Sequence, residues 1–324
     1  FFVLGYGYYK LLHYRLSAIG YRLKVSVIQG NIPQELKWRS DSKDYIMNKY
    51  LNLTRMSSID KPDLILWPEA SLPVVLEEEP GFIEEVRSFA KEIKIPLLIG
   101  AVTKREGIYY NSAILFSAAG ESLGRYDKLH LVPFGEYIPL KKYLPFLETI
   151  VPIGDINKGE EYTLFKLPIT NYQLPITFST LICFEDLFPE LSREFVKRGA
   201  GFLVNITNDA WYKKTSAPYQ HLQASVFRAI ENRVFLARAA NTGVSGFIAP
   251  SGKIISLVQG AAKRNIFIDG YQTQSMDSSG ADKTFYTRYG DIFIILCVLI
   301  LLCGIIIKFK NQNAKVKITI QNSK

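Results

Sequence analysis

The sequence is poor in cysteine and histidine, with three residues of each among 324. Two of the cysteines, Cys297 and Cys303, lie in an apolar stretch near the C-terminus, so the thiols cannot build a disulfide framework. The chain also lacks a Walker loop, a dinucleotide fingerprint and a credible cluster of metal ligands. We therefore expect no cofactor and no metal, and the remaining thiol, Cys183, becomes the residue of most interest.

Charge and composition favour an enzyme associated with a membrane over a protein that binds nucleic acid. The formal net charge is +9, but the lysines and arginines are scattered and mixed with acids. No zinc-finger, recognition-helix or aromatic single-strand signature accompanies them, so we expect no nucleic-acid partner. Hydrophobic residues make up 48% and aromatic residues 13% of the chain, against 21% charged residues. This balance favours contact with a membrane.

Three segments place a reactive side chain where an apolar, strand-like run ends. Cys183 ends the run F-S-T-L-I-C and is followed by acidic residues. Glu69 follows the run D-L-I-L-W-P, and Lys128 lies between two apolar strand-like runs, with Glu136 in the second. Each has an ordinary explanation on its own: a small buried hydrophobe, a strand-end cap and a solvated lysine. Because all three explanations would have to hold together, we expect a shared role.

A thiol nucleophile needs a proton acceptor, and the oxyanion that forms on attack needs a cation. Histidine is the usual acceptor, but His13 lies in the N-terminal leader and His221 in a predicted helix. If the segment around His130 is a strand, its side chains alternate between two faces, and His130 is not directed at the thiol either. The residues therefore indicate a carboxylate base, Glu69, with Lys128 as the cation. A carboxylate needs burial to accept a proton near neutral pH.

In this order along the chain, Glu69, Lys128 and Cys183 resemble the Glu-Lys-Cys triad of the nitrilase (carbon–nitrogen hydrolase) superfamily. Longer segments resemble one branch of it, the apolipoprotein N-acyltransferases: Gln29–Trp38, Leu66–Glu69, Tyr126–Pro139, Ile182–Asp186, Asn208–Tyr212, Gln220–Arg233 and Ala240–Ser245. The match begins near residue 23 and continues to the C-terminus. One departure is Phe184, which stands where the family tends to have tyrosine after the nucleophile.

The resemblance implies an α/β fold, the nitrilase-like four-layer αββα sandwich, and ping-pong acyl transfer through a cysteine thioester. The acyl donor would be a membrane phospholipid. The acceptor would be the N-terminal α-amine of a diacylglyceryl-cysteine apolipoprotein. Glu136 and Glu185 would orient Lys128 and shape the site, while Trp38 and Phe184 are weaker candidates for substrate binding. We expect the protein to be monomeric.

A long apolar run near the C-terminus is the clearest membrane signal. Its uninterrupted core, Ile292–Ile307, has 16 residues, or about 24 Å of helix, and Tyr289 and Phe309 can sit at the interfaces. Lysines follow this run, at Lys308, Lys310, Lys315, Lys317 and Lys324. The positive-inside rule then predicts a cytoplasmic tail, with the preceding domain on the periplasmic side of a bacterial inner membrane.

These signals divide the chain into four parts. We expect residues 23–278 to form the nitrilase-like catalytic domain, 289–309 a transmembrane helix and 310–324 a cytoplasmic basic tail. Residues 1–22, which start with F-F-V-L-G-Y-G-Y-Y-K-L-L, are interpreted as the end of a preceding membrane helix and a linker. The resemblance implies several further membrane helices before them, so the full-length protein would be multi-pass.

Between the two ends, strand-like and helical patterns alternate, which indicates a layered α/β domain. Strands are predicted at Lys24–Gln29, Asp63–Trp67, Pro96–Val102, Tyr110–Phe116, Thr180–Phe184, Phe202–Thr207 and Val244–Ala249. Helices are predicted at Gly81–Lys94, Pro189–Arg198 and Tyr219–Arg233. The turn sequences at Ala118–Ser122 and Ala249–Lys253 predict two hairpins.

Two apolar segments, Lys141–Gly154 and Ser71–Leu76, have two interpretations. They either pack onto the domain or form arms that dip into the bilayer and admit acyl chains. Two other functions also stay open. A membrane-tethered amidase of the nitrilase type would use the same triad to split a small amide with water. A membrane-anchored binding domain on an inactive nitrilase fold is the other, although loss of a triad residue would favour it and all three are present.

Overall fold

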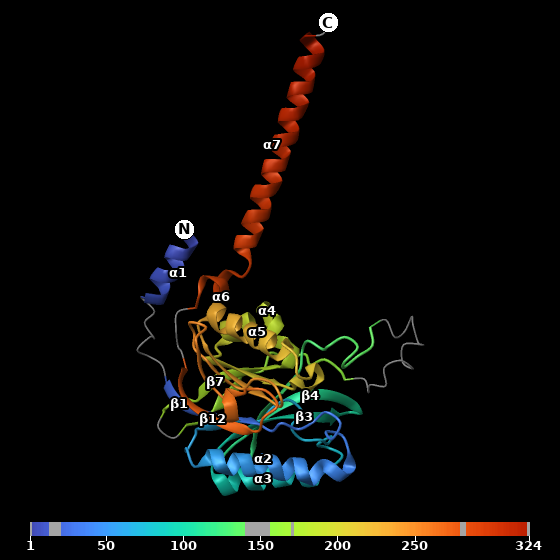
Figure 1. The fold of residues 1–324 in the computed structure, drawn as a ribbon, viewed down its shortest axis with the longest axis vertical. Helices are drawn as coiled ribbons and strands as arrows, with labels where there is room; N and C mark the ends of the chain where they lie inside the picture. Colours follow the sequence, from blue (N-terminus) through green and yellow to red (C-terminus); the bar gives the residue numbers. More distant parts are fainter. Residues whose placement is uncertain (1, 13–20, 140–155, 170–171, 279–282, 323–324) are drawn as a thin grey trace.

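The architecture has four layers, with two sheets face to face and helices outside each of them (Figure 1). The computed structural model describes residues 2–12, 21–139, 156–169, 172–278 and 283–322. Each sheet has six strands. The α/β class and the αββα sandwich that the resemblance implies are therefore confirmed.

The first sheet has the order β12-β1-β2-β3-β4-β5. Its strands are β1 (Tyr21–Gln29), β2 (Leu64–Leu66), β3 (Leu97–Arg105), β4 (Ile108–Phe116), β5 (Ser122–Asp127) and β12 (Gly270–Ser278). Strands β1, β2 and β3 run parallel, and the others pair antiparallel. Because parallel strands end at the same edge of a sheet, the residues after β2 emerge beside the ends of its neighbours.

The second sheet has the order β11-β10-β9-β8-β7-β6. Its strands are β6 (Phe165–Leu167), β7 (Ile176–Ile182), β8 (Phe202–Thr207), β9 (Phe235–Ala240), β10 (Gly246–Ile248) and β11 (Ile254–Leu257). Here β7, β8 and β9 are parallel and central. All six residues of β8 and of β9 are buried, as expected for strands covered on both faces.

Helices cover the outer face of each sheet, with α2 and α3 on the first and α4 and α5 on the second (Figure 1). The helices are α1 (Phe2–Leu12), α2 (Lys43–Ser58), α3 (Pro80–Ile93), α4 (Pro189–Arg198), α5 (Ala217–Asn232), α6 (Phe285–Tyr289) and α7 (Ile292–Asn322). Short 3-10 helices are η1 (Ser40–Ser42), η3 (Cys183–Leu187), η4 (Asp209–Tyr212) and η5 (Ala261–Lys263). Helix α4 has proline in its first turn and ends at Gly199 with φ 116°, a left-handed conformation that glycine adopts without strain.

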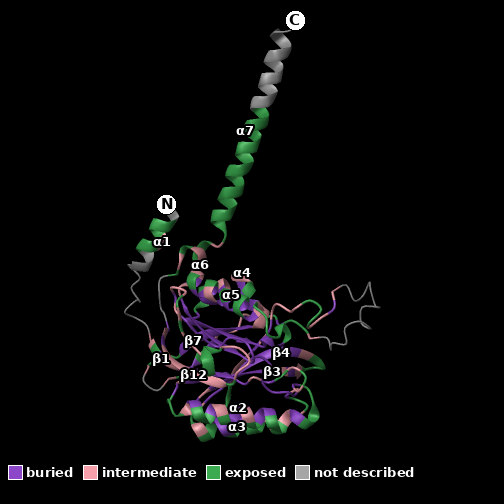
Figure 2. Ribbon diagram, in the orientation of Figure 1, coloured by how far each residue is buried: buried purple, intermediate pink, exposed green. Residues whose placement is uncertain are grey.

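The apolar core lies in two places. The larger cluster fills the space between the sheets and includes Val25 and Leu66 from the first sheet and Leu181 and Val204 from the second. The smaller one lies between the first sheet and helices α2 and α3. Figure 2 shows this arrangement as a buried interior inside exposed helix faces. The two sheets are thus packed tightly against each other, so the side chains at their edges have fixed positions.

The predicted elements are present, with one correction that concerns Cys183. Strand β8 and helix α4 have the bounds that the pattern predicts, and both predicted turns join hairpin strands. The predicted strand Thr180–Phe184 is too long, however, because β7 ends at Ile182 and Cys183 opens η3. The Glu185 carboxylate accepts a hydrogen bond from the Ile182 N–H at 2.7 Å, which stabilises the start of this helix.

Helix α7 projects away from the sandwich as a single long rod (Figure 1). Its segment Ile292–Lys310 has 19 residues with a mean hydropathy of 3.2, and none of it is buried, so it is long and apolar enough to cross a membrane. Figure 2 shows the same exposure in the described parts of α7 and α1. The helix continues beyond the predicted span, as far as Asn322.

The apolar segment Ser71–Leu76 packs into the domain, so the interpretation as a membrane-dipping arm is wrong for it. Leu72 is fully buried, and Val74 and Leu76 are almost so. All three belong to the core between the first sheet and its helices. The other apolar segment, Lys141–Gly154, lies outside the described residues.

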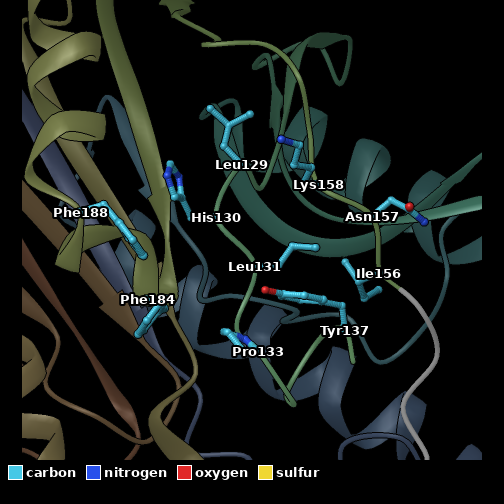
Figure 3. Close-up of a pocket in the computed structure, with 10 residues that line it drawn as sticks. All are labelled: Leu129, His130, Leu131, Pro133, Tyr137, Ile156, Asn157, Lys158, Phe184 and Phe188. Atoms are coloured by element: carbon cyan, nitrogen blue, oxygen red, sulfur yellow. The ribbon is translucent and has the colours of Figure 1, made fainter. Parts of the chain in front are cut away.

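An apolar cavity of about 640 Å³ lies between the segment after β5 and the helix η3 (Figure 3). Its walls are mainly apolar and include Leu129, Leu131, Pro133, Tyr137, Phe184 and Phe188. His130 stacks on Phe188 with 4.4 Å between ring centroids, and Asn157 and Lys158 add polar groups. Phe184 follows Cys183 and Leu129 follows Lys128, so the cavity adjoins both residues in the chain.

Candidate active site

Glu69 lies just beyond β2, in the turn that leaves the first sheet. Its carboxylate is nearly buried, and each oxygen has its own donor. Asn111 Nδ2 donates to Oε1 at 2.8 Å, and the main-chain N–H of Asn208 donates to Oε2 at 2.9 Å. Lys128 Nζ lies 3.5 Å from Oε1. The carboxylate is therefore held in one orientation with a cation beside it.

The turn that carries Glu69 packs tightly against β3. A Cβ atom at Gly100 would lie 2.4 Å from the carbonyl oxygen of Pro68 and 2.7 Å from Glu69 Cα. The main-chain N–H and the hydroxyl of Ser71 both donate to the Gly100 carbonyl, at 2.8 and 2.9 Å. Only glycine permits this approach, so the position of Glu69 depends on the neighbouring strand.

Lys128 directly follows β5 and is 1% exposed. Its ammonium group donates to Glu136 Oε1 at 3.0 Å and lies 2.9 Å from Glu136 Oε2. Burial by itself lowers the pKa of Lys128, but the nearby Glu69, Cys183 and Glu136 outweigh it and raise the pKa above its ordinary value. Lys128 is thus a permanent cation. It follows one strand but does not precede another, since residues 129–139 hold only an isolated bridge.

Cys183 follows β7 with a backbone φ of 54°, which is unusual for a residue with a side chain. Its carbonyl oxygen accepts hydrogen bonds from Asn205 Nδ2 at 3.2 Å and from His221 Nε2 at 3.3 Å. Such strained turns present a nucleophile at the end of a strand. Burial and the Glu69 charge raise the pKa of the thiol above its ordinary value, against the opposing effect of Lys128. The resting thiol is therefore neutral and needs a base.

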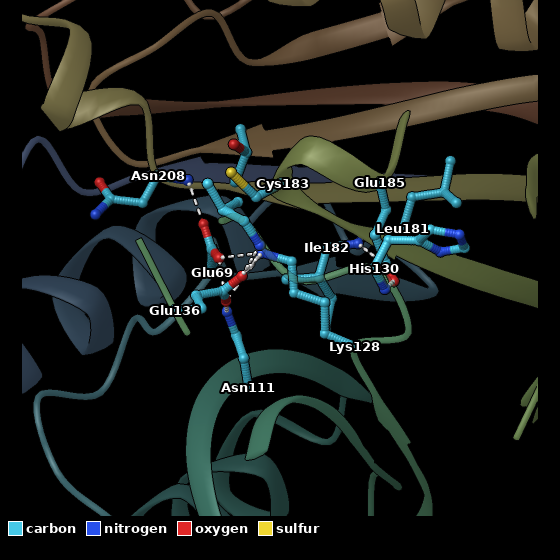
Figure 4. Close-up of polar contacts among 12 residues, drawn as sticks. Glu69, Asn111, Lys128, His130, Glu136, Leu181, Ile182, Cys183, Glu185 and Asn208 are labelled. Atoms are coloured by element: carbon cyan, nitrogen blue, oxygen red, sulfur yellow. Dashed lines mark hydrogen bonds and ion pairs between the residues drawn. The ribbon is translucent and has the colours of Figure 1, made fainter. Parts of the chain in front are cut away.

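The three predicted residues meet at one place (Figure 4). The sulfur of Cys183 and the ammonium of Lys128 face the carboxylate of Glu69, although β2 and β5 belong to one sheet and β7 to the other. The site thus lies where strand ends of the two sheets converge. A thiol, a carboxylate acceptor and a buried cation around one point can deprotonate the thiol and stabilise an oxyanion.

Glu136 and Glu185 occupy different places. Glu136 binds Lys128 directly, and its other oxygen accepts from the Val132 N–H at 2.8 Å. Glu185 is fully buried and accepts hydrogen bonds from Leu129 N–H, His130 N–H and the Tyr126 hydroxyl. Burial raises the pKa of Glu185 to about 7, although these donors and Lys128 oppose it.

Glu185 therefore acts on the main chain and not on the lysine side chain. With its second oxygen on the Ile182 N–H, the carboxylate ties the chain after Lys128 to the chain before Cys183. Such a bridge sets the distance between cation and thiol. The geometry thus separates the two supporting residues that the sequence analysis grouped together.

The two weaker candidates also differ. Phe184 is a wall of the apolar cavity. Trp38 is 51% exposed and does not line that cavity. The residue before it, Lys37, is 3% exposed, so the tight turn of residues 34–38 directs the lysine inward. Lys37 Nζ donates to the main-chain oxygen of Glu69 at 3.1 Å.

Lys37, Asn111 and Asn208 also contact Glu69, and no sequence pattern had singled them out. Asn111 Nδ2 donates to both Glu69 Oε1 and Glu136 Oε1, each at 2.8 Å. Asn208 supplies the main-chain donor to Glu69 and lies in the quoted motif N-D-A-W-Y. Four charged residues of the site lie together, and we name them the reaction cluster: Lys37, Glu69, Lys128 and Glu136.

A second buried group of charges lies behind Cys183, and we name it the support cluster: Asp186, Asp209, His221 and Arg238. Arg238 lies 3.0 Å from Asp186 and 3.2 Å from Asp209, and His221 lies 2.9 and 2.8 Å from the same carboxylates. Burial and Arg238 lower the pKa of His221, but the two carboxylates raise it to about 9. His221 contacts Cys183 at its main-chain oxygen, which suits a positioning role and not that of a base.

Comparisons with known proteins identify related sequences and structures. The sequence pattern of the carbon-nitrogen hydrolase family matches residues 24–277. The apolipoprotein N-acyltransferase of Geobacter metallireducens is 40% identical over 301 residues, which cover 91% of this chain and 55% of that protein. The one from Allorhizobium ampelinum is 35% identical, covering 78% of this chain and 48% of that protein. The chain spans about half the length of these relatives.

Solved structures show the same fold. An amidase from Nesterenkonia sp. superposes with a TM-score of 0.60 at 19% identity, covering 82% of this chain and 92% of the amidase. A variant of that amidase with acrylamide added to its active-site cysteine gives a TM-score of 0.57 at 19% identity, covering 78% of this chain and 92% of that one. With the pattern match over residues 24–277, these findings lead to one conclusion: the chain belongs to the carbon-nitrogen hydrolase family.

Proposed function

We propose that this chain carries the acyl-transferring part of an apolipoprotein N-acyltransferase. The observation that carries the proposal is the convergence of Glu69, Lys128 and Cys183 at three strand ends (Figure 4). The similarity to N-acyltransferases over most of the chain supports the reaction class. The exposed apolar helix α7 supports a location at a membrane, where a phospholipid donor is available.

In the first half-reaction Glu69 accepts the proton of the Cys183 thiol. The thiolate attacks the ester carbonyl carbon of a phospholipid, and the Lys128 ammonium stabilises the resulting oxyanion. When the tetrahedral intermediate collapses, the carbon–oxygen ester bond breaks. Protonated Glu69 returns its proton to the leaving alkoxide, so a lysophospholipid departs. The acyl chain remains on Cys183 as a thioester.

In the second half-reaction an amine replaces the thiol. The acceptor is the N-terminal α-amine of a diacylglyceryl-cysteine apolipoprotein, whose reference pKa of about 7.7–8.0 leaves a useful neutral fraction. The amine attacks the thioester carbon, and Glu69 accepts the proton that the nitrogen loses. Collapse breaks the carbon–sulfur bond and forms the amide. The proton on Glu69 then returns to the Cys183 thiolate.

Supporting residues hold this geometry. Glu136 keeps the Lys128 ammonium near Glu69, and Glu185 fixes the two chain segments that carry Lys128 and Cys183. The cavity beside Phe184 has the apolar walls and the size to accept part of an acyl chain. Trp38, which is half exposed near the site, would contact the substrate at the entrance.

The proposal also gives each region of the chain a place relative to the membrane. Residues 23–278 would form the catalytic domain and 289–309 the membrane span, with the basic residues 310–324 in the cytoplasm. The lysines after α7's apolar segment support this orientation through the positive-inside rule. The site would then face the periplasm of a bacterial inner membrane, where lipid-modified proteins are matured.

An intact-mass experiment tests the transfer mechanism. Incubation of the chain with phospholipid should raise its mass by one acyl chain, located on Cys183. A diacylated lipopeptide with a free N-terminus should then discharge the adduct, and an N-acetylated lipopeptide should not. The amide product should carry the donor's acyl chain.

Two variants serve as controls. Cys183→Ala should form no adduct, whereas a double replacement of Cys297 and Cys303 by alanine should acylate like the parent. Rapid hydrolysis of a small water-soluble amide, without an adduct from phospholipid, would instead identify a membrane-tethered amidase. Acylation of the Cys183→Ala variant would exclude this residue as the nucleophile.

A further inference from the structure

Lys37 is a lysine whose side chain is buried beside Glu69. The tight turn after β1, with Leu36 N–H bonded to Pro33 O and Lys37 N–H to Gln34 O, sets its direction. Its ammonium group donates a 3.1 Å hydrogen bond to the main-chain oxygen of Glu69. Across the part of the chain that the structure describes, Lys37 forms no ion pair with a carboxylate. Burying an unpaired ammonium is unfavourable, and such groups are concentrated at functional sites.

The two carboxylates of the reaction cluster, Glu69 and Glu136, share one cation, the ammonium group of Lys128. Glu69 and Glu136 are both held by Asn111 Nδ2, and Lys128 Nζ is the one ammonium within ion-pair distance of either in the described chain. Two carboxylates that share a site repel each other, and a nearby positive charge favours their ionised forms. Only an ionised Glu69 can accept the proton of Cys183.

We propose that Lys37 is a positioning residue that supplies a second positive charge and thereby keeps Glu69 ionised as a base. With Lys37 charged, the reaction cluster holds two ammonium groups and two carboxylates. Its hydrogen bond to the Glu69 main chain fixes the turn from which the carboxylate projects. The inference rests on the site of the proposed function, but it concerns the resting enzyme and no particular substrate.

The surrounding charges agree with this role. Burial lowers the pKa of Lys37 to about 8, and the charges of Glu69 and Cys183 partly oppose the shift. Lys37 is thus charged at neutral pH and interacts with both the base and the nucleophile. The other ionisable groups that face the two are Lys128 and Glu136, with Asp209 and Tyr212 on the side of Cys183.

The test is the pH dependence of Cys183 alkylation by iodoacetamide, followed by intact mass in a parent chain with Cys297 and Cys303 replaced by alanine. Thiol reactivity should fall at low pH, where the base that deprotonates Cys183 becomes protonated. In Lys37→Met the midpoint of this fall should move up by about 1–2 pH units, since a nearby opposite charge is lost. The Lys37→Arg variant retains the charge and should keep the parent's midpoint.

Two further results sharpen the test. Lys37→Met and the parent should converge above pH about 8, where Lys37 itself loses its proton. Adding Glu136→Gln to Lys37→Met removes one negative charge and should return the midpoint towards that of the parent. Thermal unfolding at pH 7 should show that Lys37→Met is folded, because methionine keeps the stem and removes a buried charge.

A purely structural role gives a different pattern. If Lys37→Met lowered the maximum rate without moving the midpoint, or if Lys37→Arg moved it as far as methionine does, the inference would be overturned. Alkylation needs no phospholipid, so the outcome is independent of acyl transfer. A shifted midpoint in a chain that forms no acyl adduct would keep the role of Lys37 and reject the proposed function.

Discussion

The reaction cluster and the support cluster both lie near Cys183 and are buried, yet their charges are satisfied differently. In the support cluster Arg238 lies against Asp186 and Asp209, and His221 contacts the same two carboxylates. In the reaction cluster Lys128 contacts two carboxylates, whereas Lys37 donates to a main-chain oxygen and pairs with no carboxylate in the described part of the chain.

The difference follows from what each cluster has to do. A fully paired set of buried charges has one favourable arrangement, and it holds the chain behind the nucleophile in a fixed conformation. In the proposed mechanism a proton moves between Cys183 and Glu69, so the charges around them must remain favourable in more than one protonation state. Incomplete pairing leaves this freedom, and it marks the reacting side of the thiol.

Arg238→Met should produce the largest effect, on stability. The side chains of Asp186, Asp209 and Arg238 are fully buried, so removing the guanidinium leaves two carboxylates without their main partner. Breaking a buried pair in this way costs about 3–5 kcal/mol. Chemical denaturation of the detergent-solubilised chain would measure the loss.

Arg198→Met provides a matched comparison on α4. Its ion pair with Glu194 is solvent-exposed, with 48% and 27% of the two side chains accessible. Exposed pairs contribute about 1 kcal/mol or less. A loss of similar size in the Arg198 and Arg238 variants would mean that the support cluster does not hold the fold.

Lys128→Met should mainly affect the rate. Methionine keeps the length of the stem but removes the charge that faces the oxyanion, and removal of such a group typically lowers the rate on the order of 10²–10³-fold. The rate of acyl-adduct formation on Cys183 measures the effect. Lys253→Met, at an exposed position in the β10–β11 turn, should leave that rate unchanged. Near-normal acylation by Lys128→Met would show that the oxyanion is stabilised elsewhere.

The three triad candidates could be predicted from the sequence because each lies beside an apolar, strand-like run. Such runs are visible as a pattern, and the ends of strands in a layered α/β domain tend to meet. Lys37 has no such signal, since a lysine in a polar turn is most often solvated. Asn111 lies within a strand, and its contact with both carboxylates depends on strand register. Glu185 was found, but its main-chain partners became clear only from the fold.

The fold shows the same division. Several strands with continuous apolar runs were predicted. Strand β9 was missed although it is central and fully buried. Strand β12, which pairs with β1 along its whole length, is mostly polar and was also missed. Helix α2 could have been predicted, because Ile46, Met47, Tyr50 and Leu51 follow helical spacing. The segment Ser71–Leu76 could not be decided from composition, because an apolar loop can face a core or a lipid equally well.

The smallest of the expected effects concerns pH and the support cluster. The pKa of His221 is raised to about 9 from an ordinary 6.5, so the folded chain binds this proton more tightly than the unfolded chain. The resulting stabilisation is fully present below pH about 6.5 and is lost as the pH rises through about 9. A shift of this size corresponds to at most about 3 kcal/mol. Lys37 has the opposite effect on stability, because burial lowers its pKa to about 8. Keeping its charge buried opposes folding, and this penalty decreases as the pH rises above about 8.

Comparing the parent with His221→Asn separates the two contributions, since Lys37 is present in both chains. Their difference in free energy of unfolding should be largest near pH 6 and should narrow steadily towards pH 9.5. Lys37→Met, in the reaction cluster, gives the contrast. This variant should lack the penalty that the buried charge imposes at low and neutral pH. Its free energy of unfolding should therefore not share the parent's increase above pH about 8. If the difference between parent and His221→Asn stayed constant with pH, His221 would be neutral in the folded chain. The support cluster would then carry a net negative charge, and full pairing would no longer distinguish it from the reaction cluster.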